Sequence, residues 1–384
     1  MTIAMDTPSA VDMWRREIRQ WLRENVPASL PPPEDLGTSD QHRAWERKLN
    51  AAGYSAIHWP VGHGGRDASQ EARMVFQEEY ERAGAPARIN MQGIMLAGPV
   101  ILRYGTAEQK KRWLKPLLRA DDIWCQGFSE PGAGSDLASL RTKGRVEGDM
   151  IVVSGQKMWT SVASFADWIF ALVRTDPDSS RNRGISWVMI DMTSPGVEVC
   201  PIYQIDGRSD FAEVFFDDVS VPRVNVIGEL GQGWEIAMAA LGMERGVGRR
   251  SYVQYLGNLA HAKQFAADAG LADDSSTKES LGALLGGALV YRHFANRVAT
   301  ERQNGEPGPA AVYNKLYWSE YQTRLFEAGM GLLGGRLEQP VDDLNPRISS
   351  WEREYWYSRA ARIFAGSNEI QRNIIAERVL GLPR

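Results

Sequence analysis

Cysteine is scarce in this sequence, with Cys125 and Cys200 the only two among 384 residues. Two cysteines without close ligand spacing form neither a disulfide framework nor a typical metal site. The five histidines include no His-Glu-x-x-His arrangement, so we expect no bound metal. The best candidate for a membrane segment, Leu281 to Tyr291, is too short and too glycine-rich to span a bilayer. These absences exclude a disulfide-stapled scaffold and predict a protein without a membrane span.

An excess of positive charge is also missing. Lys and Arg total 44 and Asp and Glu total 48, so the net charge is −4, and we expect neither nucleic acid nor a membrane surface as a partner. Met1 to Asp12 shows no positive segment leading into an apolar stretch, so we expect no secretory signal, and the scarcity of cysteine favours a reduced, cytoplasmic location. Apolar content of 43% and charged content of 24% are ordinary for a globular protein of two or three domains.

Three regions of different periodicity divide the chain. Helical spacing of apolar residues covers 11–119 and returns after Gln232, whereas β-branched and aromatic runs broken by Gly, Pro and Asp fill 123–227. The predicted strands are Met150–Ser154, Trp168–Arg174, Ile185–Asp191, Val197–Ile202 and Ala212–Phe216. We therefore predict a mostly α protein with a central antiparallel β domain. Its predicted domains are a helical one at 1–122, a β one at 123–228 and a helical one at 229–384.

Several helix boundaries follow from local signals. Thr106 to Gln109 is typical of a capping box, and Ser276 to Glu279 is a second candidate, opening a helix towards Gln303. Gln41 to Ala52 is predicted to be helical up to Gly53. Gly305 and the two prolines after it break the pattern, and Ala310 to Leu333 is helical again.

A glycine-rich loop at Gln126–Asp136 carries the first pattern that indicates chemistry. Its sequence is Gln-Gly-Phe-Ser-Glu-Pro-Gly-Ala-Gly-Ser-Asp, and its glycines permit backbone conformations and close ligand approach that a side chain would block. Exposed amides and the hydroxyls of Ser129 and Ser135 can donate hydrogen bonds to a polar cofactor or to phosphates. We call 126–136 the binding loop.

A second segment, Gly155-Gln-Lys-Met-Trp-Thr-Ser161, places the flat ring of Trp159 between two polar positions. Such a ring can cover one face of a planar heterocycle while a neighbouring hydroxyl reaches its edge. The residues alone leave two interpretations open. One is a binding loop beside an aromatic wall, and the other is an exposed turn near an ordinary core tryptophan.

The sequences of the binding loop and of the Trp159 segment resemble the two signature segments of the acyl-CoA dehydrogenase flavoproteins. A third segment, Ile363-Phe-Ala-Gly-Ser-Asn-Glu-Ile-Gln-Arg-Asn-Ile-Ile375, is similar to the C-terminal signature of that family. The resemblance extends over essentially the whole chain, with the segments in the family order. It implies the three-domain fold of helical, β and helical domains.

The resemblance also implies a reaction. In this family an α proton leaves an acyl-CoA thioester while a β hydride passes to flavin N5 of FAD, giving a trans-2-enoyl-CoA. The electrons then leave through an electron-transfer flavoprotein. By resemblance, the Phe128 backbone and Ser129 hold the flavin's pyrimidine side, Trp159 covers the flavin face away from substrate, and Ser161 reaches towards N5. Ser135 is expected near the acyl-CoA or the flavin phosphates, and Ser367 and Glu369 at cofactor-contacting positions.

The position of the catalytic base departs from the commonest family pattern. Many members carry a glutamate immediately before the Gly-Ser pair of the C-terminal signature, where this chain has Ala365. A branch that includes isovaleryl-CoA and long-chain dehydrogenases places the glutamate on an earlier helix, directly before an arginine. Glu244 and Arg245 occupy that position here. We therefore expect Glu244 to be the base and Arg245 to bind the CoA portion.

A second departure concerns the far half of FAD. Relatives have an Arg-x-x-Phe-Gly segment and a later glutamine–glycine stretch supplied across a subunit interface. Here these regions are Arg302–Gly305 and Gly331–Gly335, without the phenylalanine and the glutamine, so only Arg302 is expected to keep a phosphate contact. The assembly is expected to be a homodimer or homotetramer, or an α2β2 pair as in the sterol side-chain branch. Two other functions stay open: a catalytically reduced subunit, or a flavin oxidase or monooxygenase on the same fold.

Overall fold

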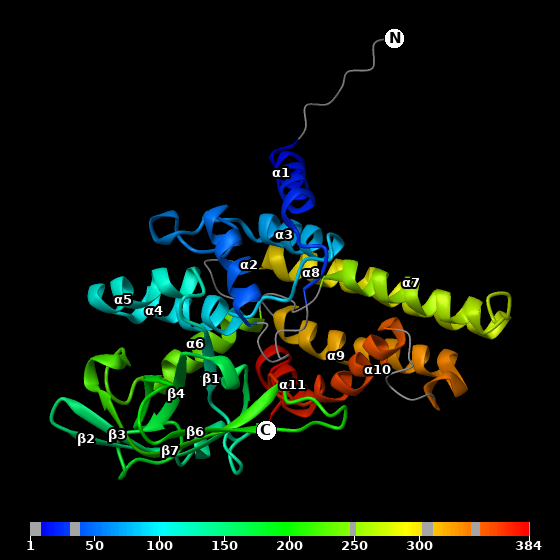
Figure 1. Ribbon diagram of the computed structural model, residues 1–384. Coiled ribbons are helices and arrows are strands. Elements are labelled where there is room, and N and C mark those ends of the chain that lie inside the picture. Colours follow the sequence, from blue (N-terminus) through cyan, green and yellow to red (C-terminus); the bar gives the residue numbers. More distant parts are fainter. Residues whose placement is uncertain (1–8, 31–38, 246–250, 302–309, 339–345, 384) are drawn as a thin grey trace. The chain divides into compact units, whose positions relative to one another are not determined.

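The computed structural model describes residues 9–30, 39–245, 251–301, 310–338 and 346–383 (Figure 1). The chain forms two compact units. We call residues 27–69 and 86–244 the sheet unit, and residues 1–26, 70–85 and 245–384 the helical unit. Both units thus combine segments that are far apart in the sequence, which the succession of helical and β patterns does not indicate. The domain boundaries near 122 and 228 stay predictions.

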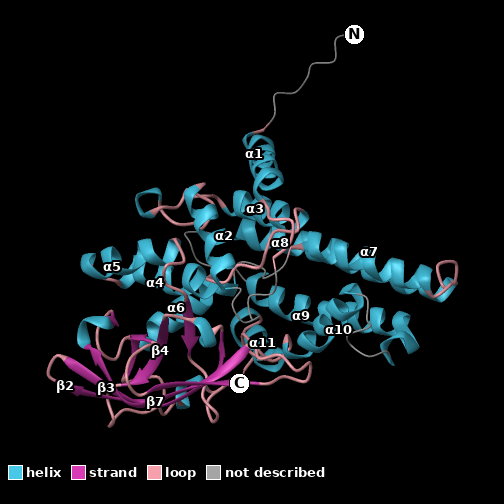
Figure 2. Ribbon diagram, viewed as in Figure 1, coloured by secondary structure: helices cyan, strands magenta, loops and turns pink. Residues whose placement is uncertain are grey.

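The strands of the sheet unit, magenta in Figure 2, belong to one eight-stranded sheet with the order β6-β7-β3-β2-β4-β5-β8, and β1 pairs in parallel with β4. Most of the other neighbours are antiparallel, as the sequence predicts. The strands are β1 (Trp124–Gly127), β2 (Lys143–Glu147), β3 (Met150–Ser161), β4 (Trp168–Arg174), β5 (Ile185–Asp191), β6 (Val197–Ile202), β7 (Phe211–Pro222) and β8 (Val226–Ile227).

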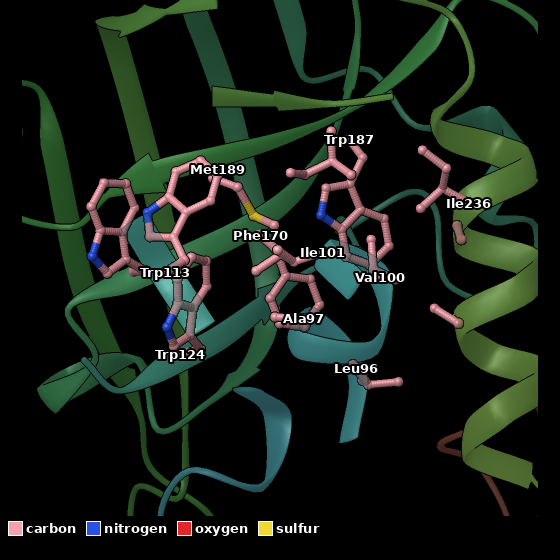
Figure 3. Packing of buried hydrophobic residues seen from close by; sticks show 14 of the residues in the cluster. Leu96, Ala97, Val100, Ile101, Trp113, Trp124, Phe170, Trp187, Met189 and Ile236 are labelled. Atoms are coloured by element: carbon pink, nitrogen blue, oxygen red, sulfur yellow. The ribbon is translucent and has the colours of Figure 1, made fainter. Parts of the chain in front are cut away.

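Strands β4 and β5 are buried on both faces because their alternate side chains enter two different cores. Trp168, Phe170 and Leu172 of β4 lie in one hydrophobic cluster, and the residues between them lie in another. Phe170 stacks on Trp187 of β5 with ring centroids 5.0 Å apart (Figure 3). Period-2 alternation of two apolar sets produces the continuous apolar runs seen in these strands.

Over its described residues, the sheet unit also contains the helices α2 (Ser39–Ala51), α4 (Gly98–Tyr104), α5 (Ala107–Leu118) and α6 (Gly233–Arg245). The predicted capping box of α5 is confirmed, with Gln109 N donating to Thr106 Oγ1 and Thr106 N donating to Gln109 Oε1. Gly233 starts α6 where an added Cβ would lie 2.4 Å from the Ser186 carbonyl carbon. This close approach fixes the start of α6 against β5, and Ile236 of α6 lies in the same cluster as Trp187 (Figure 3).

The helical unit consists, over its described residues, of α1 (Ala10–Asn25), α3 (Gln70–Arg82), α7 (Tyr252–Asp268), α8 (Ser275–Glu301), α9 (Ala310–Leu333), α10 (Pro346–Ala360) and α11 (Asn368–Ile374). Aromatic rings fill its core. Tyr255 contacts Tyr321 edge-on at 4.9 Å, and Phe326 contacts Trp351 at 4.9 Å. Gly329 lets α9 approach α10, because an added Cβ would lie 2.2 Å from the Trp351 ring.

A buried carboxylate joins α1 and α3 within the helical unit. Glu79 is 2% exposed and forms ion pairs with Arg15 and Arg19, each at 2.8 Å, and with Arg82. Burial alone would raise the pKa of Glu79, but the arginines outweigh it and lower this pKa to about 2. The α1–α3 contact therefore depends on a charged Glu79.

Most predicted elements match the structure, and the misses have local causes. The predicted ranges of β4, β5, β6 and α9 are confirmed to the residue. The predicted cap at Ser276 is wrong: α8 begins at Ser275, and Asp274 accepts from Thr277 N at 2.8 Å. Strands β1, β2 and β8 are not among the predicted strands, and β2 is missing because its Lys-Gly-Arg-Val-Glu sequence lacks an apolar run. Among the described residues, no helix has the length and apolarity needed to cross a membrane.

Candidate active site

The binding loop and the Trp159 segment, both in the sheet unit, are hydrogen-bonded to each other. The loop leaves β1 after Gly127, and Ser129 O accepts from Met158 N of β3 at 2.8 Å. A tight turn follows, in which Glu130 and Ala133 exchange backbone hydrogen bonds of 3.1 and 3.0 Å. Segments about thirty positions apart in the sequence thus form one structural element.

A buried ion pair lies at the junction of these segments. Lys157 Nζ donates to Glu130 Oε1 at 2.7 Å and to Phe128 O at 3.3 Å, and the lysine is fully buried. Glu130 also accepts from the backbone amides of Arg141 at 2.6 Å and Thr142 at 2.9 Å. Burial opposes the charge of Glu130, but Lys157 and these donors outweigh it and lower the pKa of the carboxyl. Burial lowers the pKa of Lys157, and the charge of Glu130 opposes that shift.

Trp159 has an unusual backbone conformation and an exposed ring. Its φ is +60°, in the left-handed region that a bulky residue rarely adopts, and the residue is 53% exposed. The β3–β7 register shifts between Lys157 and Thr160, so Trp159 lies in a β-bulge. The indole meets Phe211 edge-on at 6.0 Å. Bulges re-aim side chains near functional sites, and such strain is retained where the surrounding structure fixes it.

Two of the hydroxyls expected to contact the cofactor are near this bulge. Ser161 follows Trp159 by two residues, and the backbone of Ser129 is hydrogen-bonded to Met158. Ser129 and Ser161 are partly buried, and Ser135 is exposed on the binding loop. The Phe128 ring is buried against Phe170 and Trp187, at 5.9 and 5.3 Å. The ring therefore belongs to the core, and the cofactor contact expected of the Phe128 backbone stays a prediction.

A pocket of about 580 Å³ lies beside the binding loop in the sheet unit. Its walls are the end of that loop with the residues that follow it, the β4–β5 connection, and Trp234 at the start of α6. Among the described residues that line it, Arg141, Arg174 and Arg181 are cationic and Asp136 is the one carboxylate. Arg174 joins the two walls by donating to Ala138 O at 3.0 Å and to Arg181 O at 2.9 Å. The excess of positive charge suits an anionic ligand.

Glu244 and Arg245 are the last two residues of α6. Leu241, one turn earlier, is partly buried and packs against the hydrophobic cluster that contains Trp187. The side chains of Glu244 and Arg245 lie outside the described part of the structure, as does Val247. The expected burial of the Glu244 carboxylate therefore stays a prediction, whereas the core packing of α6 up to Leu241 is shown.

The C-terminal signature lies in the helical unit and begins with a left-handed turn. Ala365 and Gly366 have φ of +54° and +82°. Ser367 then caps α11 by accepting from Ile370 N at 3.3 Å, and Glu369 in the first turn is exposed. Backbone hydrogen bonding and the Ser367 hydroxyl lower the pKa of Glu369, so it is an anion at neutral pH.

Asn368, which lies between Ser367 and Glu369, anchors α11 to α9. Its Oδ1 accepts from Lys315 Nζ at 2.8 Å and from Ser319 Oγ at 3.0 Å, and all three residues are buried. Arg302 and the segment to Gly305 lie outside the described residues. Gly331 is in α9, and Gly334 and Gly335 form the turn after it.

The structure thus joins Phe128 and Ser129 to the strand that carries Trp159 and Ser161, and it places Ser367 and Glu369 in one capped turn of the helical unit. The sequence reasoning missed the arginines of the pocket. The local sequence Ser180-Arg-Asn-Arg183 between two predicted strands is a basic signal. Its relation to Arg141 and Trp234 arises only from tertiary folding.

Comparisons with known proteins cover the whole chain. Three family models match in order: "Acyl-CoA dehydrogenase, N-terminal domain" at residues 9–121, "Acyl-CoA dehydrogenase, middle domain" at 125–219 and "Acyl-CoA dehydrogenase, C-terminal domain" at 231–380. The acyl-CoA dehydrogenase IpdE1 of Mycolicibacterium smegmatis is 40% identical over 97% of this chain and 98% of the relative.

Solved structures give the same result. A chain of the ChsE4-ChsE5 complex from Mycobacterium tuberculosis superposes with a TM-score of 0.84 at 31% identity, covering 100% of both chains. A chain of the Tcur3481-Tcur3483 steroid ACAD gives 0.86 at 27% identity, again over 100% of both chains. The fold and the order of its domains are therefore those of the matched family.

Proposed function

This chain belongs to the acyl-CoA dehydrogenase family and is an oxidoreductase that acts on the CH–CH group of an acyl-CoA. On that premise we propose that it binds FAD and forms a trans-2-enoyl-CoA, with Glu244 as the base. The observation that carries the proposal is the hydrogen-bonded pair of segments that presents Trp159 at a bulge beside the binding loop. The electrons pass to an electron-transfer flavoprotein in this proposal.

The residues of the sheet unit fit a flavin. A half-exposed indole, held in a strained left-handed conformation, offers a flat apolar surface to a planar ring system. Ser129 and Ser161 supply hydroxyls for the polar edge of the ring, and the backbone at Phe128 supplies further hydrogen-bonding groups. In the helical unit, Ser367, the Glu369 carboxylate and Arg302 would serve as further cofactor contacts. Bound FAD supplies the two-electron acceptor that no amino-acid side chain can provide.

The pocket fits the charged part of the substrate. Coenzyme A carries phosphate groups, and Arg141 and Arg181 present exposed guanidinium groups at a pocket that Trp234 also lines. Arginine pairs with phosphate through two parallel hydrogen bonds, and an indole face can pack against a purine. Ser135, at the exposed end of the binding loop, would contact the acyl-CoA chain, and Arg245 would bind the CoA portion, as the family resemblance implies.

Glu244 takes the α proton in this proposal. A base acting on a weakly acidic C–H bond works best when its pKa lies near the working pH, and a partly apolar environment raises the pKa of a carboxylate. Leu241 brings such an environment to within one helical turn. Ala365, at the alternative family position, has no group that can accept a proton. The proton therefore has one candidate acceptor among the two family positions.

Assembly into an oligomer is proposed from α8. From Gly282 to Val290 this helix carries no charged residue, yet Leu285, Leu289 and Val290 are 45%, 43% and 46% exposed. An uncharged helical face of this kind marks a contact surface. We propose that it packs against another acyl-CoA dehydrogenase chain, in a homodimer, a homotetramer or an α2β2 complex.

Light scattering on the protein expressed alone tests this assembly. A stable oligomer with one FAD per chain that becomes monomeric on Leu289→Asp supports the homo-oligomer. A monomer that assembles only with a second, unlike dehydrogenase chain supports the α2β2 arrangement. A fully active wild-type monomer contradicts both.

An anaerobic single-turnover experiment tests the catalytic proposal. The FAD-loaded protein is mixed with straight-chain, branched and steroid-side-chain acyl-CoA thioesters, and the loss of oxidised-flavin absorbance is followed with product identified by mass spectrometry. Bleaching with formation of an enoyl-CoA is the expected result. Bound flavin that no thioester reduces would instead indicate a catalytically reduced subunit. Rapid reoxidation of the reduced flavin by oxygen would indicate an oxidase or monooxygenase.

A further inference from the structure

The buried ion pair between Glu130 and Lys157 holds three separate backbone segments together. Through Glu130 Oε1 and Oε2 it binds the amides of Thr142 and Arg141, and through Lys157 Nζ it binds the carbonyl of Phe128. Lys157 is itself the first residue of the register shift that contains Trp159. Every one of these backbone contacts lies next to a residue that the proposed function assigns to FAD or to the CoA portion.

We propose that Glu130 and Lys157 are positioning residues, which set the placement of Ser129, Trp159 and Arg141 for cofactor and substrate. This inference rests on the proposed function. Neither side chain is accessible enough to touch a ligand, since Lys157 is 0% and Glu130 8% exposed. They act through the backbone: Lys157 fixes the Phe128 carbonyl, and Glu130 fixes the first residues after the binding loop.

The alternative is that the pair merely stabilises the sheet unit. Burying two charges costs so much desolvation that well-packed apolar residues often stabilise a fold equally well. A buried pair that instead satisfies three backbone groups at a site specifies one conformation of that site. A second buried ion pair in the sheet unit serves as a control that distinguishes a positioning role from a stabilising one. Glu46 and Arg88 are joined at 2.6 Å, and Arg88 also binds Ser55 O. Glu46 lies in α2 and Ser55 in the turns that follow it, so these contacts of Arg88 belong to a part of the sheet unit outside the binding loop and the Trp159 segment.

The two cations can therefore be replaced in parallel. Lys157→Met and Arg88→Met each remove a cation and leave a buried carboxylate behind, so both are expected to lower the urea midpoint of unfolding. Only Lys157→Met should weaken FAD binding, because only Lys157 bonds to the binding loop. The expected loss of affinity is about tenfold or more, and tenfold corresponds to about 1.4 kcal/mol. Hydrogen exchange of the apoprotein supplies a readout without flavin or activity. Peptides covering 126–136 and 155–161 should exchange faster in Lys157→Met and at the wild-type rate in Arg88→Met.

The outcomes separate the inference from its premise. Failure of the wild-type protein to bind FAD removes the proposed function and needs no variant. Wild-type FAD affinity in folded Lys157→Met overturns the positioning role, and so does an equal loss of affinity in Arg88→Met. Should Lys157→Met not fold, Glu130→Gln keeps an acceptor oxygen and removes the charge. Faster exchange confined to the same two peptides, with weaker FAD binding, supports the role in that variant, and unchanged exchange and affinity overturn it.

Discussion

The sheet unit and the helical unit each bury a lysine beside their candidate site residues, but they surround it differently. In the sheet unit, Lys157 bonds to the carboxylate of Glu130. In the helical unit, Lys315 donates to the amide oxygen of Asn368, which Ser319 also contacts. A left-handed residue with a side chain lies within three positions of each anchor: Trp159 follows Lys157, and Ala365 precedes Asn368.

The difference indicates which unit holds its site more rigidly. Glu130 fixes two backbone amides with a charged acceptor, and hydrogen bonds to charged groups are stronger than neutral ones. In the helical unit, Lys315 bonds instead to the side-chain amide of Asn368, between Ser367 and Glu369, and Glu369 is exposed. We infer that the candidate cofactor contacts of the sheet unit are more rigidly held than those of the helical unit.

The largest effect is expected at the end of α6, where the sheet unit ends. Glu244→Gln keeps the size and polarity of the side chain and removes the basic oxygen. Losing general-base help should slow flavin reduction by acyl-CoA by ~10²–10⁴-fold, while FAD remains bound. Stopped-flow reduction of the FAD-loaded variant measures the rate.

Glu235→Gln is the matched control, because Glu235 is an exposed glutamate in the first turn of the same helix. It should react at the wild-type rate. Near-normal reduction in Glu244→Gln would refute its role as base and direct the search to other carboxylates.

The next largest effect concerns the helical unit and acid. The folded pKa of Glu79 is about 2, below its ordinary 4.5, so its stabilisation is complete above pH 4.5 and disappears as the pH falls towards 2. Glu79→Gln should lower the free energy of unfolding at pH 7 by roughly 2 kcal/mol, a value reduced because its arginine partners are partly in solvent. Urea unfolding of wild type and Glu79→Gln at pH 7 and at pH 3 measures the difference in the free energy of unfolding at each pH.

The difference between wild type and Glu79→Gln should shrink at the lower pH, because the wild-type carboxylate then begins to take up a proton. Glu71→Gln, at an exposed position of α3, should leave the pH dependence unchanged. A wild-type and variant difference that is the same at both pH values would contradict the assigned pKa shift.

The sequence predicted those parts of the two units that depend on local patterns. Long apolar runs gave β4 and β5, and a sustained helical period gave α9, because burial fixes such elements wherever they pack. The resemblance supplied Ser129, Trp159 and Ser161 as candidates. The pairing of Glu130 with Lys157 was not predicted, because two charges about thirty residues apart give no periodic signal. The bulge at Trp159 was not predicted either, because it depends on the register between β3 and β7, which the local sequence does not show.

A smaller effect tests whether the sheet unit presents Trp159 to a ligand. Because the residue is 53% exposed, Trp159→Ala should change the urea midpoint little. It should weaken FAD binding, because a stacked aromatic contributes ~0.5–1.5 kcal/mol beyond its buried area. Fluorescence titration of the apoprotein with FAD measures the affinity. Tyr203→Ala, which removes the ring of a residue that is 76% exposed just after β6, should leave it unchanged. Equal affinities in wild type and Trp159→Ala would contradict the proposed stacking.

The smallest effect has the opposite pH dependence from that of Glu79 and belongs to the sheet unit. Burial, with Asp167 and Asp121 nearby, raises the pKa of Asp122 from 3.8 to about 6, although Arg43 opposes the shift. Its charged form is therefore disfavoured in the fold, and the stability present below pH 3.8 is lost as the pH rises through 6.

Asp122→Asn should accordingly raise the free energy of unfolding at pH 7, by about 1 kcal/mol or less after allowance for solvent screening. At pH 4 the gain should nearly vanish, because the wild-type carboxyl is then mostly protonated in the fold. Peptide-resolved hydrogen exchange at the two pH values measures it, since slower exchange should appear in β1 and β4 and not in α1 and α3. A variant that is less stable than wild type at pH 7 would show that the Asp122 carboxylate is held by favourable contacts, and the two units would then respond to acid in the same direction.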